Sequence, residues 1–158
     1  QKIVIPSKKE VKNILLWRPS DISEIEEVTT KGGDWIVLVK SATNVLRGDN
    51  FVFVYPELLQ NKYILRRGEI ITSEILERKD LEYKNINSEI KNLLSQARYN
   101  IKLRGSIVNE ITTRGNFVSK IRDSLKINQN NKYRLDVVSL KDSKTADPII
   151  VELNITEL

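Results

Sequence analysis

The 158-residue sequence contains no cysteine and no histidine. Without cysteine there are no disulfides, no thiolate zinc sites and no cysteine nucleophiles. Without histidine, the chain has no Ser–His–Asp triad, no imidazole metal ligand and no histidine general base. The catalytic chemistries that remain need carboxylates, lysine, tyrosine, or a hard cation held by carboxylates.

Methionine and long apolar runs are missing as well. No stretch approaches the ~20 apolar residues that a membrane-spanning helix needs. The chain begins at Gln1, with neither a signal peptide nor a methionine anywhere. We therefore expect a piece cut from a longer protein, with any anchor or targeting signal outside it.

The composition is typical of a globular chain, with 40% hydrophobic and 30% charged residues. The length suits one globular domain. We expect a helical N-terminal extension over residues 1–31 and a mixed-sheet core over residues 33–158. The net charge of +5, from 26 Lys and Arg against 21 Asp and Glu, permits an anionic partner without requiring one.

Apolar periodicity predicts the secondary structure. A capping box at residues 7–10 precedes a helix through Val11, Ile14 and Leu15. Ser20 or Asp21 is expected to cap a second short helix. Longer helices are predicted over residues 88–103, with Asn87 as cap and Gly105 at the C-terminal end, and over residues 117–125. Strands are predicted at residues 2–6, 35–40, 51–55, 63–65, 69–76, 106–112, 133–140 and 149–155.

These elements predict an α/β (α+β) fold, a mixed sheet with helices packed on it. From residue 34 onward the order is β-β-β-α-β-α-β, which is also the order of ribonuclease-H-like domains. A ribonuclease-H-type nuclease needs a carboxylate inside the first core strand, but Trp35–Lys40 has none and Asp34 only precedes it. The other acidic candidates are scattered: Asp49, Glu110, Asp136, Asp147 and Glu152. We therefore expect no catalytic residue, no metal and no cofactor, and we expect Trp17 and Trp35 to pack in the core or at its rim.

The stretch SATNVLRGDN, residues 41–50, lies between two strand-like runs. One interpretation is a hairpin connection, since Asn, Gly and Asp favour turns for local reasons. The other is a loop that grips an anion or lines a small-ligand or glycan pocket, together with the basic turn at residues 66–68. A basic face of the 88–103 helix is a further candidate for nucleic acid or lipid headgroups, although solvated charge is the ordinary interpretation. The resulting candidate contact residues are Asn44, Arg47, Asp49, Arg66, Arg67, Lys91, Arg98 and Lys102.

The stretch GDWIVLVKSATNVLRGDNFVFVYP, followed by LRRGEII, resembles the C-terminal domain of a cyanobacterial family catalogued as domain of unknown function 3084. The similarity continues through Ala97-Arg98-Tyr99, Phe117–Leu125, LDVVSL and ADPIIVELNI, and covers most of residues 33–155. The resemblance implies two N-terminal transmembrane segments, a long coiled coil, and this domain at the C-terminus. It implies no catalytic residue. If the loop between the membrane segments is basic, the domain lies outside the plasma membrane or in a lumen, including that of thylakoids.

We therefore expect a non-enzymatic protein-interaction or scaffolding domain of a membrane-anchored coiled-coil protein. We expect it to bind a protein partner, and a second copy of the chain is one candidate for that partner. The alternative is a catalytically inactive ribonuclease-H-like domain that binds nucleic acid. Binding that weakens steeply with salt distinguishes the alternative from the first hypothesis.

Overall fold

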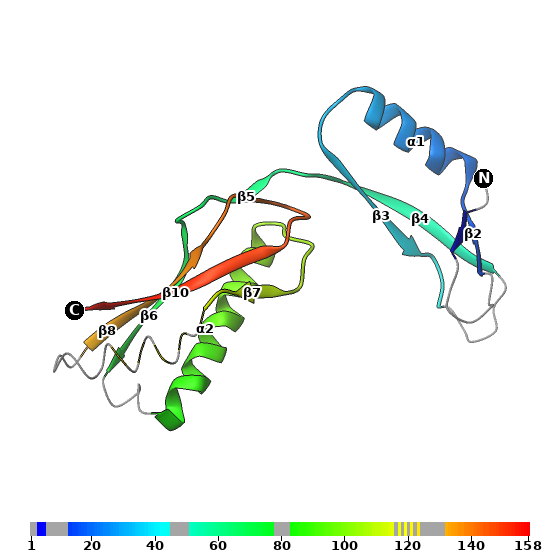
Figure 1. Ribbon diagram of the computed structural model, residues 1–158. Helices are drawn as coiled ribbons and strands as arrows, with labels where there is room; N and C mark the ends of the chain where they lie inside the picture. The colour runs from blue at the N-terminus through cyan, green and yellow to red at the C-terminus, as the bar shows by residue number, and fades with distance from the viewer. Residues whose placement is uncertain are drawn as a thin grey trace. The chain divides into compact units, whose positions relative to one another are not determined.

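The computed structural model describes residues 3–5, 13–44, 51–77, 83–115, 117, 119, 121, 123 and 132–158. Contacts divide the chain into two compact units, residues 1–61 and residues 62–158. Each unit has its own four-stranded sheet and its own long helix (Figure 1). The boundary after Asn61 differs from the expected one at residues 31–33, because residues 51–53 pair with residues 14–16 and residues 54–60 pair with residues 35–41.

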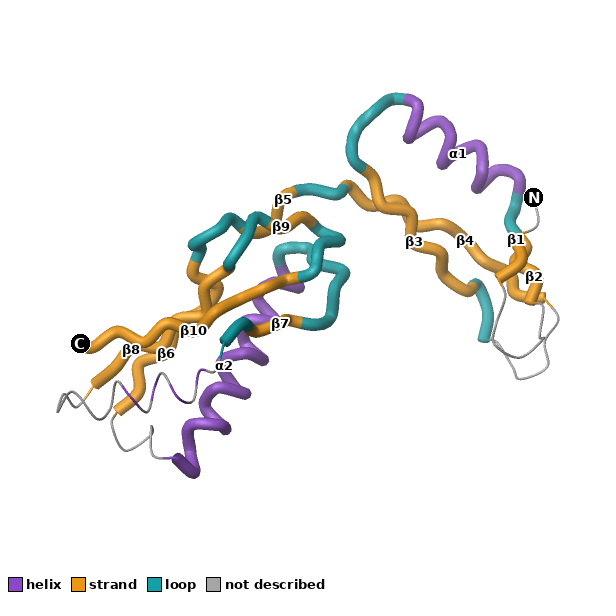
Figure 2. Tube along the Cα trace, viewed as in Figure 1, coloured by secondary structure: helices purple, strands orange, loops and turns teal. Residues whose placement is uncertain are grey.

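The first unit is built on a sheet with the strand order β1-β2-β4-β3 (Figure 2). β4 runs parallel to β2 and antiparallel to β3, so the sheet is mixed. Helix α1 packs against β4. The bounds are Ile3–Ile5 for β1, Asn13–Leu16 for β2, Pro19–Thr30 for α1, Trp35–Ser41 for β3 and Phe51–Gln60 for β4.

The helix expected over residues 11–15 is wrong, because Asn13–Leu16 forms strand β2. A short apolar run fits either periodicity, and its partner decides between them. Here Leu15 pairs with Val52 of β4, a neighbour far along the chain. The capping box expected at residues 7–10 lies outside the described residues.

Helix α1 starts at Pro19, earlier than the expected caps Ser20 and Asp21 allow. Proline is favoured at the first helical position because its missing N–H has no intrahelical acceptor there. The buried Asp21 carboxylate accepts a hydrogen bond from Arg18 Nε at 3.2 Å and forms an ion pair with Arg18 Nη2 at 3.0 Å. This ion pair fixes the bend between β2 and α1.

The second unit has the sheet order β6-β8-β10-β7. β8 runs antiparallel to both β6 and β10, and β7 is parallel to β10. A separate pair, β5 with β9, is antiparallel. Helix α2 lies against β6 and β8 (Figure 1). The bounds are Tyr63–Leu65 for β5, Ile70–Glu77 for β6, Tyr83–Leu103 for α2, Ile111–Thr113 for β7, Lys132–Ser139 for β8, Ser143–Lys144 for β9 and Ile149–Glu157 for β10.

The expected α+β class, with mixed sheets and helices packed on them, is therefore confirmed. The expected single core sheet is wrong. Among the described strands, β3 and β4 pair only within the first unit, and β6 to β10 pair only within the second. The ribonuclease-H-like order of elements thus does not correspond to one ribonuclease-H-like sheet.

Helix α2 supplies most of the helical side of the second unit's core. Its buried residues recur at helical spacing: Ile86, Leu93, Ala97 and Ile101. It begins at Tyr83, earlier than the expected cap at Asn87. At its C-terminal end, Gly105 has φ +98° and donates to Lys102, while Ser106 donates to Ile101. These two bonds form a Schellman motif, and Gly105 is the left-handed residue that was expected at this end of the helix.

A bulge in β6 ties the sheet to α2. Ile70 pairs with Val138, and the next pair lies two residues on in β6 but one residue on in β8, so Ile71 is the extra residue. The Asn100 amide of α2 donates to the Ile71 carbonyl at 3.2 Å. A bulge removes a backbone group from the ladder, and a helix side chain satisfies it here.

The helix expected over residues 117–125 is described only at residues 117, 119, 121 and 123, all of which are helical. Phe117 and Ile121 are buried in the core, as expected. The strand expected over 106–112 is shorter and later, at Ile111–Thr113.

Candidate functional site

The polar 41–50 stretch begins as a hairpin connection. The Ala42 N–H donates to the Phe53 carbonyl at 2.8 Å and so prolongs the pairing of β3 with β4. The Ser41 hydroxyl donates to the Thr43 carbonyl. Asn44 is exposed, and Arg47 and Asp49 lie outside the described residues. The described part of the stretch is therefore a turn, and the anion-gripping role of Arg47 stays a prediction.

A cavity of about 440 Å³ lies beside this turn. The indole N–H of Trp17 is buried there and has no hydrogen-bond acceptor among the described residues. Trp35 does not line this cavity; it is 37% exposed, and its indole N–H donates to the Gly32 carbonyl at 3.0 Å. The cavity is lined by Leu16, Trp17, Arg18, Ala42, Thr43, Phe53, Val54 and Tyr55.

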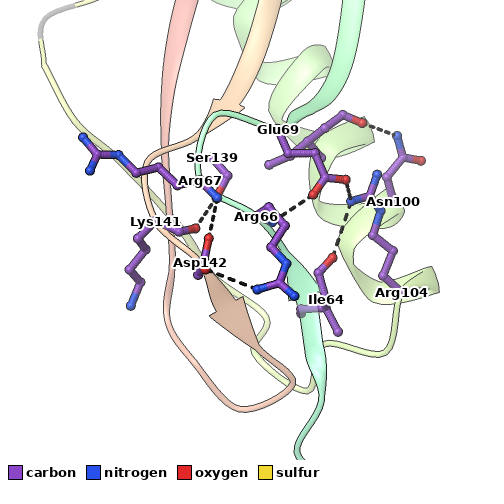
Figure 3. Close-up of polar contacts among 10 residues, drawn as sticks. Ile64, Arg66, Arg67, Glu69, Asn100, Arg104, Ser139, Lys141 and Asp142 are labelled. Atoms are coloured by element: carbon purple, nitrogen blue, oxygen red, sulfur yellow. Dashed lines mark hydrogen bonds and ion pairs between the residues drawn. The ribbon is translucent and has the colours of Figure 1, made fainter.

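The basic turn at Arg66 and Arg67 is held by an acidic side chain from a distant loop (Figure 3). The Arg66 guanidinium lies 3.3 Å from the Asp142 carboxylate, and the Arg67 backbone N–H donates to the same carboxylate at 2.7 Å. The turn closes with the Glu69 N–H donating to the Arg66 carbonyl at 3.1 Å. Gly68 has φ +81° at the third position, as a type II turn requires. We call residues 66–69 and 140–142 the corner.

The corner also contacts the end of α2. The Arg104 guanidinium pairs with the Glu69 carboxylate and donates to the Ile64 carbonyl at 3.5 Å (Figure 3). The Glu69 carboxylate accepts the Arg66 N–H at 2.9 Å. This backbone N–H, followed by the Arg104 and Arg66 guanidinium groups, lowers the pKa of Glu69. In the same way, the Arg67 backbone N–H and then the Arg66 side chain lower the pKa of Asp142.

Lowered pKa values keep both carboxyls ionised near neutral pH, whereas a general acid or base needs a pKa close to that pH. The Arg66 guanidinium also lies over the Tyr63 ring, 4.2 Å from its centroid, and the Lys144 ammonium lies 5.2 Å from the same centroid. Arg66 thus contacts Asp142, Glu69 and the Tyr63 ring. The Arg67 side chain extends away from them (Figure 3) and is exposed.

The expected basic face of α2 is present. Lys91, Arg98 and Lys102 are all exposed, and their spacing of seven and four residues places them on one stripe. No ion pair joins them to any acidic side chain that the structure describes. Tyr99 and Leu103 are exposed on the same helix. Sequence reasoning identified the three cationic residues as candidates but not Tyr99, the exposed tyrosine beside them.

The net charge is divided unevenly. Residues 1–61 hold 8 Lys and Arg against 8 Asp and Glu, and residues 62–158 hold 18 against 13. The first unit is therefore neutral, and the second carries the whole excess of +5. The basic candidate residues of the second unit thus belong to a unit with a net positive charge, whereas the first unit has no net charge.

Three of the acidic candidates, Asp34, Asp136 and Asp147, are engaged in local structure. Asp136 is buried in β8 and accepts from the Ser73 hydroxyl at 2.6 Å and from the Arg134 guanidinium at 3.0 Å. Asp147 accepts the Lys144 N–H at 2.8 Å, and Asp34 accepts from the Asn61 amide. In the described part of the chain, no three acidic side chains gather as a cation site.

The first unit has an apolar sheet face that sequence reasoning missed. Along β4, Phe51, Phe53 and Tyr55 are 56%, 58% and 39% exposed, while the alternating Val52 and Val54 are buried. Lys40 of β3 pairs with Tyr55, so the even-numbered residues of β3 share the face of the three rings. We call this surface, Ile36, Leu38, Phe51, Phe53 and Tyr55, the open face.

Charge on the open face is already compensated. Lys40 forms an ion pair with Glu57, and the hydrogen bond between these two side chains raises the pKa of Lys40. A signal for the open face exists in the sequence, because WIVLV and FVFVY are apolar at every position. Such runs are typical of strands covered on both faces.

Comparison with protein-family models, curated proteins and solved structures gives no match for this chain. None of the helices that the structure describes is long and apolar enough to cross a membrane.

Proposed function

We propose that this chain is a non-enzymatic interaction domain with a scaffolding role, and that the first unit binds a second copy of the chain. The open face carries this proposal. Three aromatic side chains stand exposed in one row of β4, and none of them neighbours an uncompensated charge on that face. Aromatic residues are enriched where proteins bind one another.

The size of the open face supports binding. An aromatic side chain buries about 150–250 Å² when it is covered, so three half-exposed rings offer roughly 300 Å² of apolar surface. That value is in the range of the largest apolar patch on a typical monomer, about 300–600 Å², and such patches are often functional. Ile36 and Leu38 of β3, which are half-buried, enlarge the patch.

The charge distribution favours a second copy as the partner. Two copies of the first unit meet without net repulsion, since that unit is neutral. The second unit carries +5 and would repel its own kind. Absence of histidine and cysteine, together with carboxyl pKa values held low at the corner, supports a role without catalysis.

Sedimentation equilibrium over a range of protein concentrations tests the proposal. The wild-type mass is expected to rise with concentration toward twice the monomer mass. Leu38→Lys, which places a charge on the β3 side of the open face, should return the chain to monomer. Leu103→Lys is the matched control, because Leu103 is 69% exposed on α2 of the second unit. Interfaces of standard size have dissociation constants well below about 100 μM. A wild-type chain that is still monomeric at that concentration therefore contradicts the proposal.

Nucleic-acid binding is the second candidate, and the stripe on α2 favours it. Lys91, Arg98 and Lys102 have no acidic partner in the described residues, and they belong to the unit that holds the whole charge excess. Tyr99 offers a ring on which a base can stack beside cations that contact phosphates. Binding to a single-stranded oligonucleotide that weakens steeply as salt is added is the expected result for this candidate.

The family resemblance supplies the cellular setting of the proposal. It implies a membrane-anchored, coiled-coil protein whose C-terminal part is this chain. If the loop between the membrane segments is basic, the domain lies outside the plasma membrane or in a lumen. Protease treatment of spheroplasts tests the location, since an outward-facing domain is digested and an inward-facing one is protected.

A further inference from the structure

Strand β3 presents an open edge. It is the last strand of the order β1-β2-β4-β3, and no described strand pairs with its outer side. Natural proteins protect such edges with proline, bulges or inward-pointing charges. β3 contains no proline, and its pairing with β4 runs without a register shift from Trp35 to Ser41. Its one charged side chain, Lys40, is paired with Glu57.

Backbone hydrogen bonds show which residues of β3 face this edge. The Ala42 N–H donates to β4, and the Asp34 carbonyl accepts from Asn61 at 2.8 Å. Alternate residues of a strand direct their N–H and C=O groups to opposite edges, so the even-numbered residues between these two face β4. Val39 lies opposite Pro56, which has no N–H to give, as expected for an outward residue. The outward residues are Trp35, Val37, Val39 and Ser41.

We infer that β3 joins two copies of this chain edge to edge, as an antiparallel pair with Leu38 on the two-fold axis. The inference rests on the proposed self-association and names its contact. In this register Val37 lies opposite Val39 of the second copy, and Trp35 lies opposite Ser41. Every outward N–H and C=O group of both copies then enters the ladder. An antiparallel edge is self-complementary, as a two-fold interface requires.

The side chains fit this register. Two β-branched residues, Val37 and Val39, meet across the strands, which is a favourable cross-strand pair. Lys40 lies opposite Ile36 of the second copy, so no like charges stand directly opposite. The even-numbered residues of both copies point to one side of the joined sheet. The two open faces therefore become one continuous apolar surface on an eight-stranded sheet.

Single cysteines test the register, because the chain has none of its own. Leu38 forms a non-hydrogen-bonded pair with itself across the axis, where the Cα atoms of an antiparallel ladder are about 4.5 Å apart. A disulfide fits Cα separations of about 4.4–6.8 Å. Leu38→Cys is expected to form a covalent dimer of doubled mass under mild oxidation. Ile36→Cys is the control, since Ile36 shares the face and the half-burial of Leu38 but lies roughly 13 Å from its own copy.

A mixture of two variants gives a second readout. Ile36→Cys and Lys40→Cys lie opposite each other in this register, so the mixed pair should cross-link while neither variant links to itself. A non-covalent dimer whose Leu38→Cys variant cross-links no more than Ile36→Cys overturns the β3 inference and leaves the proposed function standing. A chain that is monomeric at every concentration overturns both.

Discussion

Replacing Leu93 by alanine tests whether α2 closes the core of the second unit. Leu93 is 0% exposed and belongs to the core cluster that α2 shares with β6, β8 and β10. The three lost carbons cost about 2.4 kcal/mol of transfer free energy, at ~0.8 kcal/mol each. The cavity left behind raises the expected loss of unfolding free energy to about 3–5 kcal/mol. Leu103→Ala on the same helix should cost less than about 0.5 kcal/mol, because Leu103 is 69% exposed.

Both variants replace leucine by alanine in one helix, so the difference between them isolates burial from helix propensity. Urea unfolding, monitored through hydrogen exchange of the α2 amides, measures the change in the unfolding free energy of the second unit. Indole fluorescence alone is unsuitable, since Trp17 and Trp35 both lie in the first unit. Equal losses for the two variants, within about 0.5 kcal/mol, would refute the burial assigned to this helix face.

Two further predictions concern the corner and the α2 stripe. The folded-state pKa values of Glu69 and Asp142 are lowered from ordinary values of 4.5 and 3.8. Their contribution to stability is therefore complete above these ordinary values and is lost as the pH falls through the lower folded values. The melting temperature of E69Q/D142N should fall less on acidification below about pH 4 than that of the wild type, and parallel curves contradict the assignment. Replacing Lys91, Arg98 and Lys102 by glutamine should weaken single-stranded oligonucleotide binding and reduce the slope of log K against log salt by about 2. Failure of the wild type to bind at ~50 mM salt removes the nucleic-acid alternative.

The elements with strong periodicity were predictable from the sequence. The α2 stripe from Ile86 to Ile101 repeats at three and four residues over several turns, and Gly105 marks its end. The strands at β3, β4, β6, β8 and β10 were found from apolar runs. Short elements were less predictable, because an isolated run such as NILL at Asn13–Leu16 fits a helix or a strand, and only its pairing with β4 decides.

The candidate contact residues separate in the structure. Arg66 and Arg67 are drawn into the corner by Asp142, a residue 75 or 76 positions away whose role no local pattern reveals. Lys91, Arg98 and Lys102 remain exposed, as a polar helix face predicts. Sequence reasoning missed the open face. A run of apolar residues indicates that burying them is favourable, but it does not identify the surface that would cover them.

The sequence alone determined the chemistry that is absent, the class of the fold and the position of the long helix, because composition and periodicity act through neighbours along the chain. Tertiary structure decided the rest. It assigned β3 and β4 to the N-terminal unit, left the charge excess entirely in the other, and exposed both a row of aromatic rings and an unpaired strand edge. These outcomes depend on which strands meet across long stretches of chain, and pairing energy between distant residues has no local signature.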